Sequence, residues 1–154
     1  MGTPFASNGA PPHSGEDALT VKQYIIQTLI LDVLERDIGR IGASNLKMAD
    51  IYAQFLRQAQ DNASRDLFHL RKQFRSRGIK VYEEERLEHG IRVQYVCRGY
   101  QHSFYMLRGL IRAEVKKQMQ AYLHIAAAQT SNLSTKAASL SSNNSASTSP
   151  QLGI

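Results

Sequence analysis

Apolar side chains recur at helical spacing through the first half of the chain. Between residues 20 and 38 they occupy two faces of the predicted helix. One of these faces is formed by Tyr24, Leu31, Leu34 and Ile38. A helix this apolar is expected in the middle of a core or at a subunit interface. Ser44 is a suitable N-cap for a second helix, which the next apolar stripe predicts over residues 45–59.

A third helix is predicted over residues 63–77. Its inner stripe is formed by Leu67, Leu70 and Phe74. Residues 60–63, of which the first three are polar, are expected to form a short break between the second and third helices. Gly78 should end the third helix, because glycine is the usual residue just after a helix C-terminus.

The apolar pattern changes to a period of two after Gly78. Alternation over residues 79–87 and 91–97 predicts a β-hairpin with residues 88–90 as its loop. On the first strand, one face is expected to carry Ile79, Val81, Glu83, Glu85 and Leu87. The helical period returns over residues 101–127 and predicts a long helix of about seven turns. We therefore expect a mainly α-helical fold with one β-hairpin, in the α+β class.

Composition separates a foldable segment from two tails. Residues 1–18 hold few large apolar groups, and residues 129–154 are rich in Ser, Thr and Asn. Such segments bury too little apolar surface to offset the entropy of ordering, so both are expected to be disordered. One domain is predicted over residues 19–128.

The chain is basic, with 19 Lys and Arg against 13 Asp and Glu and a formal net charge of +6. The cations concentrate in residues 61–80 and 91–127. No apolar run is long enough to cross a bilayer, and no secretory signal is recognisable. The single cysteine excludes an internal disulfide and a cysteine-based zinc site. These features predict a cytoplasmic protein with no membrane partner.

The order of predicted elements resembles a winged helix–turn–helix domain with an added C-terminal helix. The most specific match is Leu67-x2-Leu70-x3-Phe74-x3-Gly78-Ile79, in which a recognition helix ends in glycine and enters the wing. The resemblance is at the level of the superfamily and covers residues 20–98. It implies double-stranded DNA as the partner, with the helix over residues 63–77 in the major groove.

The outward face of that helix supplies the candidate DNA-binding residues. We expect base edges to be read by Arg65, His69, Lys72 and Ser76, and phosphates to be held by Arg75, Arg77 and Lys80, with Arg92 or His89 at the wing. Phe68 is expected in the core, with contact to a thymine methyl as the alternative. The predicted function is transcriptional regulation. The alternative is a protein-interaction adaptor on the same scaffold, which would use the C-terminal helix and the acidic strand.

The long C-terminal helix carries a basic stripe beside a wide apolar band. Arg108, Arg112 and Lys116 recur every four residues. The segment beyond Lys117 is predicted to pair with its copy in a homodimer. The alternative is that it folds back over the first helix.

Enzyme chemistry finds no support in the sequence. The five histidines lack the spacing of a zinc site, and Ser44-x-x-Lys47 lacks the companion motifs of acylating enzymes. Cys97 is expected to be a small buried hydrophobe. We predict no catalytic residue, no metal and no cofactor.

Overall fold

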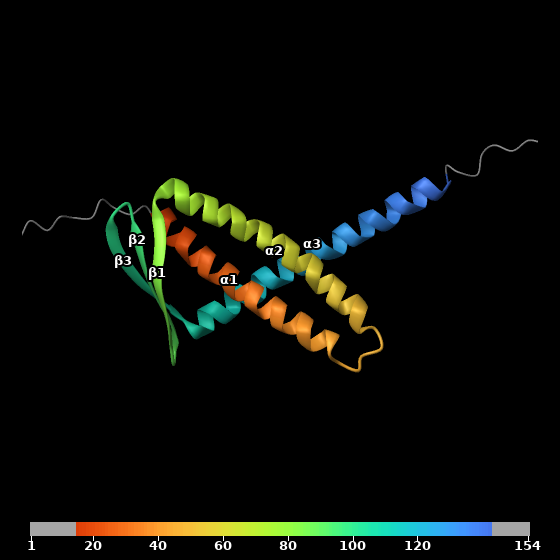
Figure 1. Cartoon of the computed structure of the whole chain (residues 1–154), viewed down its shortest axis with the longest axis horizontal. Coiled ribbons are helices and arrows are strands. Elements are labelled where there is room, and N and C mark those ends of the chain that lie inside the picture. Colours follow the sequence, from red (N-terminus) through yellow and green to blue (C-terminus); the bar gives the residue numbers. More distant parts are fainter. Residues whose placement is uncertain (1–14, 143–154) are drawn as a thin grey trace, which may run out of the picture.

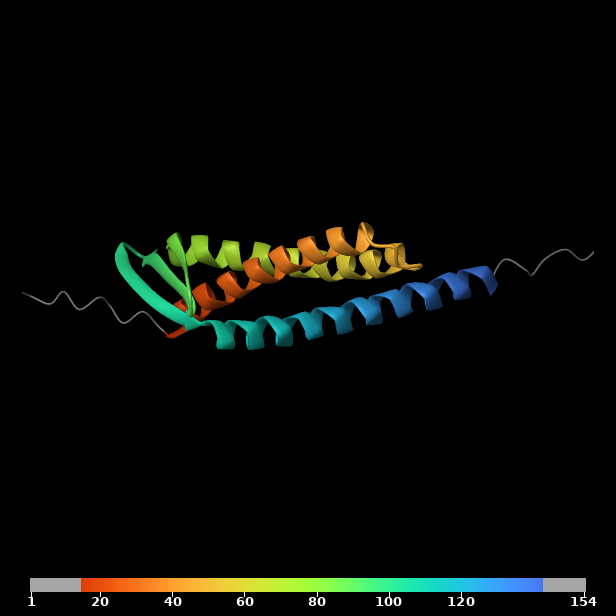
Figure 2. The same ribbon diagram turned by 90° about the horizontal axis from the view of Figure 1, so that it is seen from below.

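A computed structural model describes residues 15–142 and shows three long helices with a small sheet at one end (Figure 1). The elements in chain order are α1 (Gly15–Gly42), α2 (Ala49–Arg77), β1 (Ile79–Leu87), β2 (Gly90–Cys97), β3 (Tyr100–Leu107) and α3 (Arg108–Ser142). The strands form one antiparallel sheet in the order β1-β2-β3. The expected α+β class is thus confirmed. Figure 2 shows α3 running below the layer formed by α1 and α2.

Helix α1 lies at the centre of the core, as its two apolar faces predicted. Val21 and Ile25 pack against the inner face of the sheet, which contributes Val93 and Tyr95. Ile26, Ile30 and Leu34 pack against α2 and α3. One helix therefore joins the sheet end of the molecule to the helical end.

Helix α2 is continuous from Ala49 to Arg77, so the predicted break at residues 60–63 is wrong. These residues include neither Gly nor Pro, and Ala59 and Ala63 are fully buried against α1. The Asn62 side chain donates to Gln129 on α3 at 3.2 Å. Packing thus continues the helix, despite the low helix propensity of Asp61 and Asn62. Residues 45–77 do not form the pair of helices that a helix–turn–helix unit requires.

The predicted stop at Gly78 and the predicted hairpin are both confirmed. Gly78 adopts φ +64°, and its N–H donates to the Phe74 and Arg75 carbonyls. β1 and β2 then pair from Ile79↔Cys97 to Leu87↔Gly90. A bulge between Val81 and Glu83 changes which side chains share a face. Glu83 and Glu85 therefore do not continue the face of Ile79 and Val81, which corrects the predicted alternation.

Strand β3 replaces the start of the predicted C-terminal helix. Arg98 and Gly99, with φ of +50° and +86°, form the two-residue turn that joins β2 to β3. Positive φ at both central positions is the geometry of a type I′ hairpin turn. β3 pairs with β2 along its whole length, and α3 begins only at Arg108.

Helix α3 folds back over α1 and α2 rather than leaving the domain at Lys117. Tyr122 and Ala126 are buried against both helices. The helix continues to Ser142, beyond the domain end expected at residue 128 (Figures 1 and 2). Residues 15–18, predicted as part of the N-terminal tail, belong to α1. Residues 1–14 and 143–154, the rest of the two predicted tails, lie outside the described residues. Within residues 15–142, no helix is both long and apolar enough to cross a membrane.

Candidate nucleic-acid interface

The C-terminal half of α2 turns one side to α1 and the other to solvent. Leu67 and Phe74 are buried on the inner side. The outer side carries five of the residues predicted to contact DNA, and all five are exposed: Arg65, His69, Lys72, Arg75 and Ser76. The structure therefore brings these five together on one open helix surface.

Three cations of this surface have no carboxylate partner in the described part of the chain. We call Arg65, Lys72 and Arg75 the α2 basic face. Arg65 donates to the neutral Asn62 Oδ1 at 2.8 Å, and neither Lys72 nor Arg75 forms an ion pair within residues 15–142. Their charge is thus not neutralised by neighbouring groups.

Ser76 and His69, which lie beside the α2 basic face, already make contacts within their own helix. Ser76 Oγ donates to the Gln73 carbonyl of its own helix at 2.9 Å. The His69 ring lies edge-on to Phe68, with ring centroids 5.9 Å apart. Phe68 is 59% exposed, so the expectation that it packs in the core is wrong. The ring of Phe68 is therefore accessible for the alternative role, an apolar contact with a thymine methyl.

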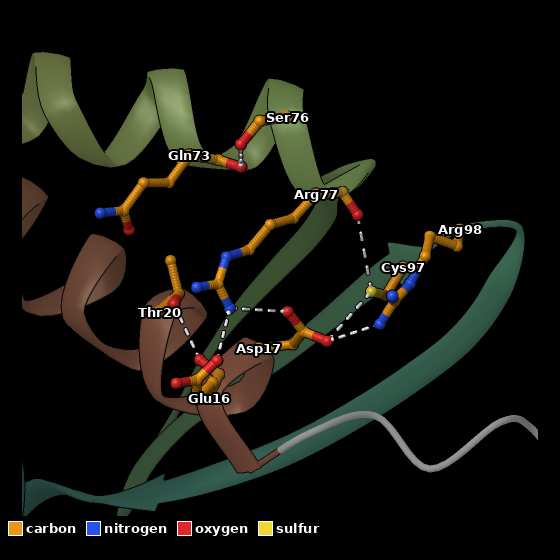
Figure 3. Close-up of polar contacts among 8 residues, drawn as sticks. All are labelled: Glu16, Asp17, Thr20, Gln73, Ser76, Arg77, Cys97 and Arg98. Carbon is orange, nitrogen blue, oxygen red and sulfur yellow. Dashed lines mark hydrogen bonds and ion pairs between the residues drawn. The ribbon is translucent and has the colours of Figure 1, made fainter.

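Arg77 belongs to a different cluster, at the junction of α2 with the sheet (Figure 3). Its Nη1 lies 3.2 Å from Asp17 Oδ1 and 3.3 Å from Glu16 Oε2. Arg98 Nη2 reaches the other oxygen of Asp17 at 2.8 Å, and Cys97 Sγ lies 3.8 Å from that same oxygen. The hydrogen bond that Arg77 donates to Asp17 is the largest cause of the raised pKa of Arg77. Arg77 therefore joins the end of α2 to α1, whereas Arg98 joins α1 to the sheet, and Arg77 is not an unpaired cation.

Lys80 and Arg92 lie on the outer face of the sheet, opposite the core. Arg92 Nη1 forms an ion pair with Glu85 Oε2 at 3.2 Å on the adjacent strand. His89, in the β1–β2 turn, lies 3.9 Å from Glu88. Lys80 is exposed without an ion pair among the described residues. Among the described residues, Lys80 thus has no acidic partner, whereas Arg92 is paired with Glu85.

Asp17 is the residue of this region that sequence reasoning did not single out. It falls within the tail predicted for residues 1–18, yet it is only 2% exposed. Its partners Arg77 and Arg98 are 60 and 81 residues away in the chain. No local pattern marks such a contact. Within residues 15–142, no three or more His, Cys, Asp and Glu side chains lie together as a metal ion would require.

These features define a class of α+β proteins in which three long helices carry a three-stranded sheet at one end. The model of one family, described as YhjD protein, matches residues 12–127, and the chain belongs to this family. It is similar to the uncharacterized protein YhjD of Bacillus subtilis (strain 168), with 27% identity over 103 residues. The aligned part is 67% of this chain and 86% of the relative. No solved structure matches the chain.

Proposed function

We propose that the protein binds double-stranded DNA through the α2 basic face and acts as a transcriptional regulator. The observation that carries this proposal is the exposure of Arg65, Lys72 and Arg75 on one side of a helix, without carboxylate partners in the part of the chain described. Phosphate oxygens attract such cations, and the release of condensed counterions favours binding. This mode uses one continuous helix and no helix–turn–helix. The cytoplasmic location expected from the sequence belongs to the same proposal.

The spacing of the α2 basic face agrees with the dimensions of a DNA groove. Arg65 and Arg75 are ten positions apart, or about 15 Å along the axis at about 1.5 Å per residue. The major groove of B-DNA is about 12 Å wide. A helix lying across or within it can therefore place its two end cations near the phosphates of opposite strands. Phe68 lies between them and could contact a thymine methyl.

Salt dependence tests the proposal on the unmodified full chain. Anisotropy of a labelled mixed-sequence duplex should show binding at ~50 mM salt that weakens roughly 10- to 100-fold at ~200 mM, as counterion release predicts for about three phosphate contacts. No binding at the lower concentration would contradict the proposal. That result would instead favour the protein-interaction adaptor.

We also propose a homodimer that forms through α3, as operator-binding proteins commonly require. A groove of about 530 Å³ runs between α1 and α3, and we call it the α1–α3 groove. Its apolar floor includes Val33, Val115 and Met119, whereas Arg108, Arg112 and Lys116 line its α3 side. Asp37 lines the α1 side. A two-fold axis would place Asp37 of one copy against the basic side of the other, so that each copy contributes one acid to the three cations of its partner.

A charge placed on the groove floor should dissociate this dimer. Met119→Glu is expected to give monomer mass in sedimentation at micromolar protein, because dimerisation would have to remove the water from a carboxylate in the apolar floor. The matched control is Leu133→Glu, at an α3 position that is 67% exposed and outside the groove. Monomer mass for the unmodified protein would refute the homodimer.

A further inference from the structure

A second cavity lies where α1, α2 and α3 meet, and no part of the proposed function uses it. Its volume is about 420 Å³, within the usual range for small-molecule sites. Gln27, Asp66, His69 and Tyr122 lie in its wall. The wall also contains three further glutamines and the apolar side chains of Leu70, Ala121 and Ile125. The cavity therefore combines hydrogen-bonding groups with an apolar surface.

A chain of hydrogen bonds, buried at Gln27 and partly buried at Asp66, fixes one carboxylate in this wall. Gln27 Nε2 donates to the Ala63 carbonyl and to Tyr122 Oη, each at 2.8 Å. Tyr122 Oη in turn donates to Asp66 Oδ2. Burial, followed by the hydrogen bond to Asp66, raises the pKa of Tyr122, so the phenol keeps its proton at neutral pH. The Asp66 carboxylate is thus held from one side by a rigid donor.

The charge of the wall indicates what the cavity would accept. Asp66 is its fixed charge among the lining residues, and the other polar groups are amides, a phenol and an imidazole. Tyr122 binds one Asp66 oxygen, and no ion pair involves Asp66 within residues 15–142. A charged donor from a ligand can therefore complete the hydrogen bonding of this carboxylate, because charge-assisted hydrogen bonds are the stronger ones.

We propose that this cavity binds a small organic cation. An ammonium or amidinium group would lie against Asp66, and the carbon part of the ligand would contact Leu70 and Ile125. One carboxylate with amide neighbours is a poor site for a metal ion, which requires several oxygen ligands. The inference rests on the cavity and its hydrogen bonds, and it does not depend on DNA binding.

Benzamidinium and its neutral counterpart benzamide, which have nearly the same shape, test the proposal. Calorimetric titration of the full chain at constant ionic strength should give tighter binding of benzamidinium, by about fivefold, because its charged donor binds an exposed carboxylate that Tyr122 holds from one side. Asp66→Asn should remove this preference, while its amide oxygen can still accept from Tyr122. Asp61→Asn is the matched control, since Asp61 lies on the same helix, is exposed and is outside the cavity wall.

A second variant keeps the test decisive if Asp66→Asn unfolds. Ala121→Phe should fill the cavity and block benzamidinium without changing any charge, because Ala121 lines the cavity and is itself exposed. Equal binding of benzamidinium and benzamide would overturn the proposal. Retention of benzamidinium affinity in both Asp66→Asn and Ala121→Phe, or no benzamidinium binding to the unmodified chain, would overturn it as well.

Discussion

Replacing Arg65, Lys72 and Arg75 together by glutamine is expected to weaken duplex DNA binding roughly 100-fold at ~0.1 M salt. Each of these side chains is exposed, and none forms an ion pair with an acid in the described residues. Each lost phosphate contact should lower the slope of log affinity against log salt by about one unit, so the variant should lose about three. Anisotropy titrations at several salt concentrations measure both quantities.

A matched triple variant controls for net charge alone. Arg36, Arg40 and Lys47 are also exposed, and they lie at the opposite end of the helices, around the α1–α2 connection. Replacing them by glutamine removes the same three charges and should change the slope little. If the two triple variants weaken binding equally, the α2 basic face is not the DNA-binding surface.

Asp17→Asn is expected to lower the free energy of unfolding by about 2–3 kcal/mol, since hydrogen bonds to charged groups contribute more than neutral ones. One oxygen of Asp17 binds Arg77, and the other binds Arg98. An amide keeps one acceptor and turns the other into a donor that faces an arginine. Thermal unfolding followed by circular dichroism should show a midpoint lower by roughly 10 °C for a domain of this size.

Glu16→Gln is the control, because Glu16 pairs with the same arginine. Its carboxylate lies 3.3 Å from Arg77, but its side chain is 73% exposed. Exposed ion pairs contribute about 0–1 kcal/mol, so this variant should unfold close to the unmodified protein. If the two substitutions lower the free energy of unfolding equally, the burial of Asp17 does not add to the stability that its ion pairs provide.

The parts of the fold that were predictable are those with a strong local signal. The two-faced apolar pattern of residues 20–38 placed α1 in the core, and Gly78 ended α2 where expected. The alternation on β2 predicted its buried face correctly, including Cys97. The open surface with Arg65 and Lys72 also followed from helical geometry alone.

The errors arose where distant parts of the chain decide the structure. Residues 60–63 look like a break until Ala63 is seen to be buried against α1 and Asn62 to contact α3. Residues 101–107 fit both a helical and a two-residue period, and pairing with β2 selects the strand. The contacts of Asp17, and the link from Gln27 through Tyr122 to Asp66, join elements far apart in sequence. No local pattern contains them.

The absence of a break in α2 also affects the entropy of association. Because Arg65, Lys72 and Arg75 project from one helix anchored along its length by α1, the spacing of their backbone positions is the same before and after a ligand arrives. No loop or inter-helix angle has to be ordered on contact, so the conformational cost is confined to the side chains. A preorganised array of this kind would accept only those duplexes whose phosphates already match its spacing.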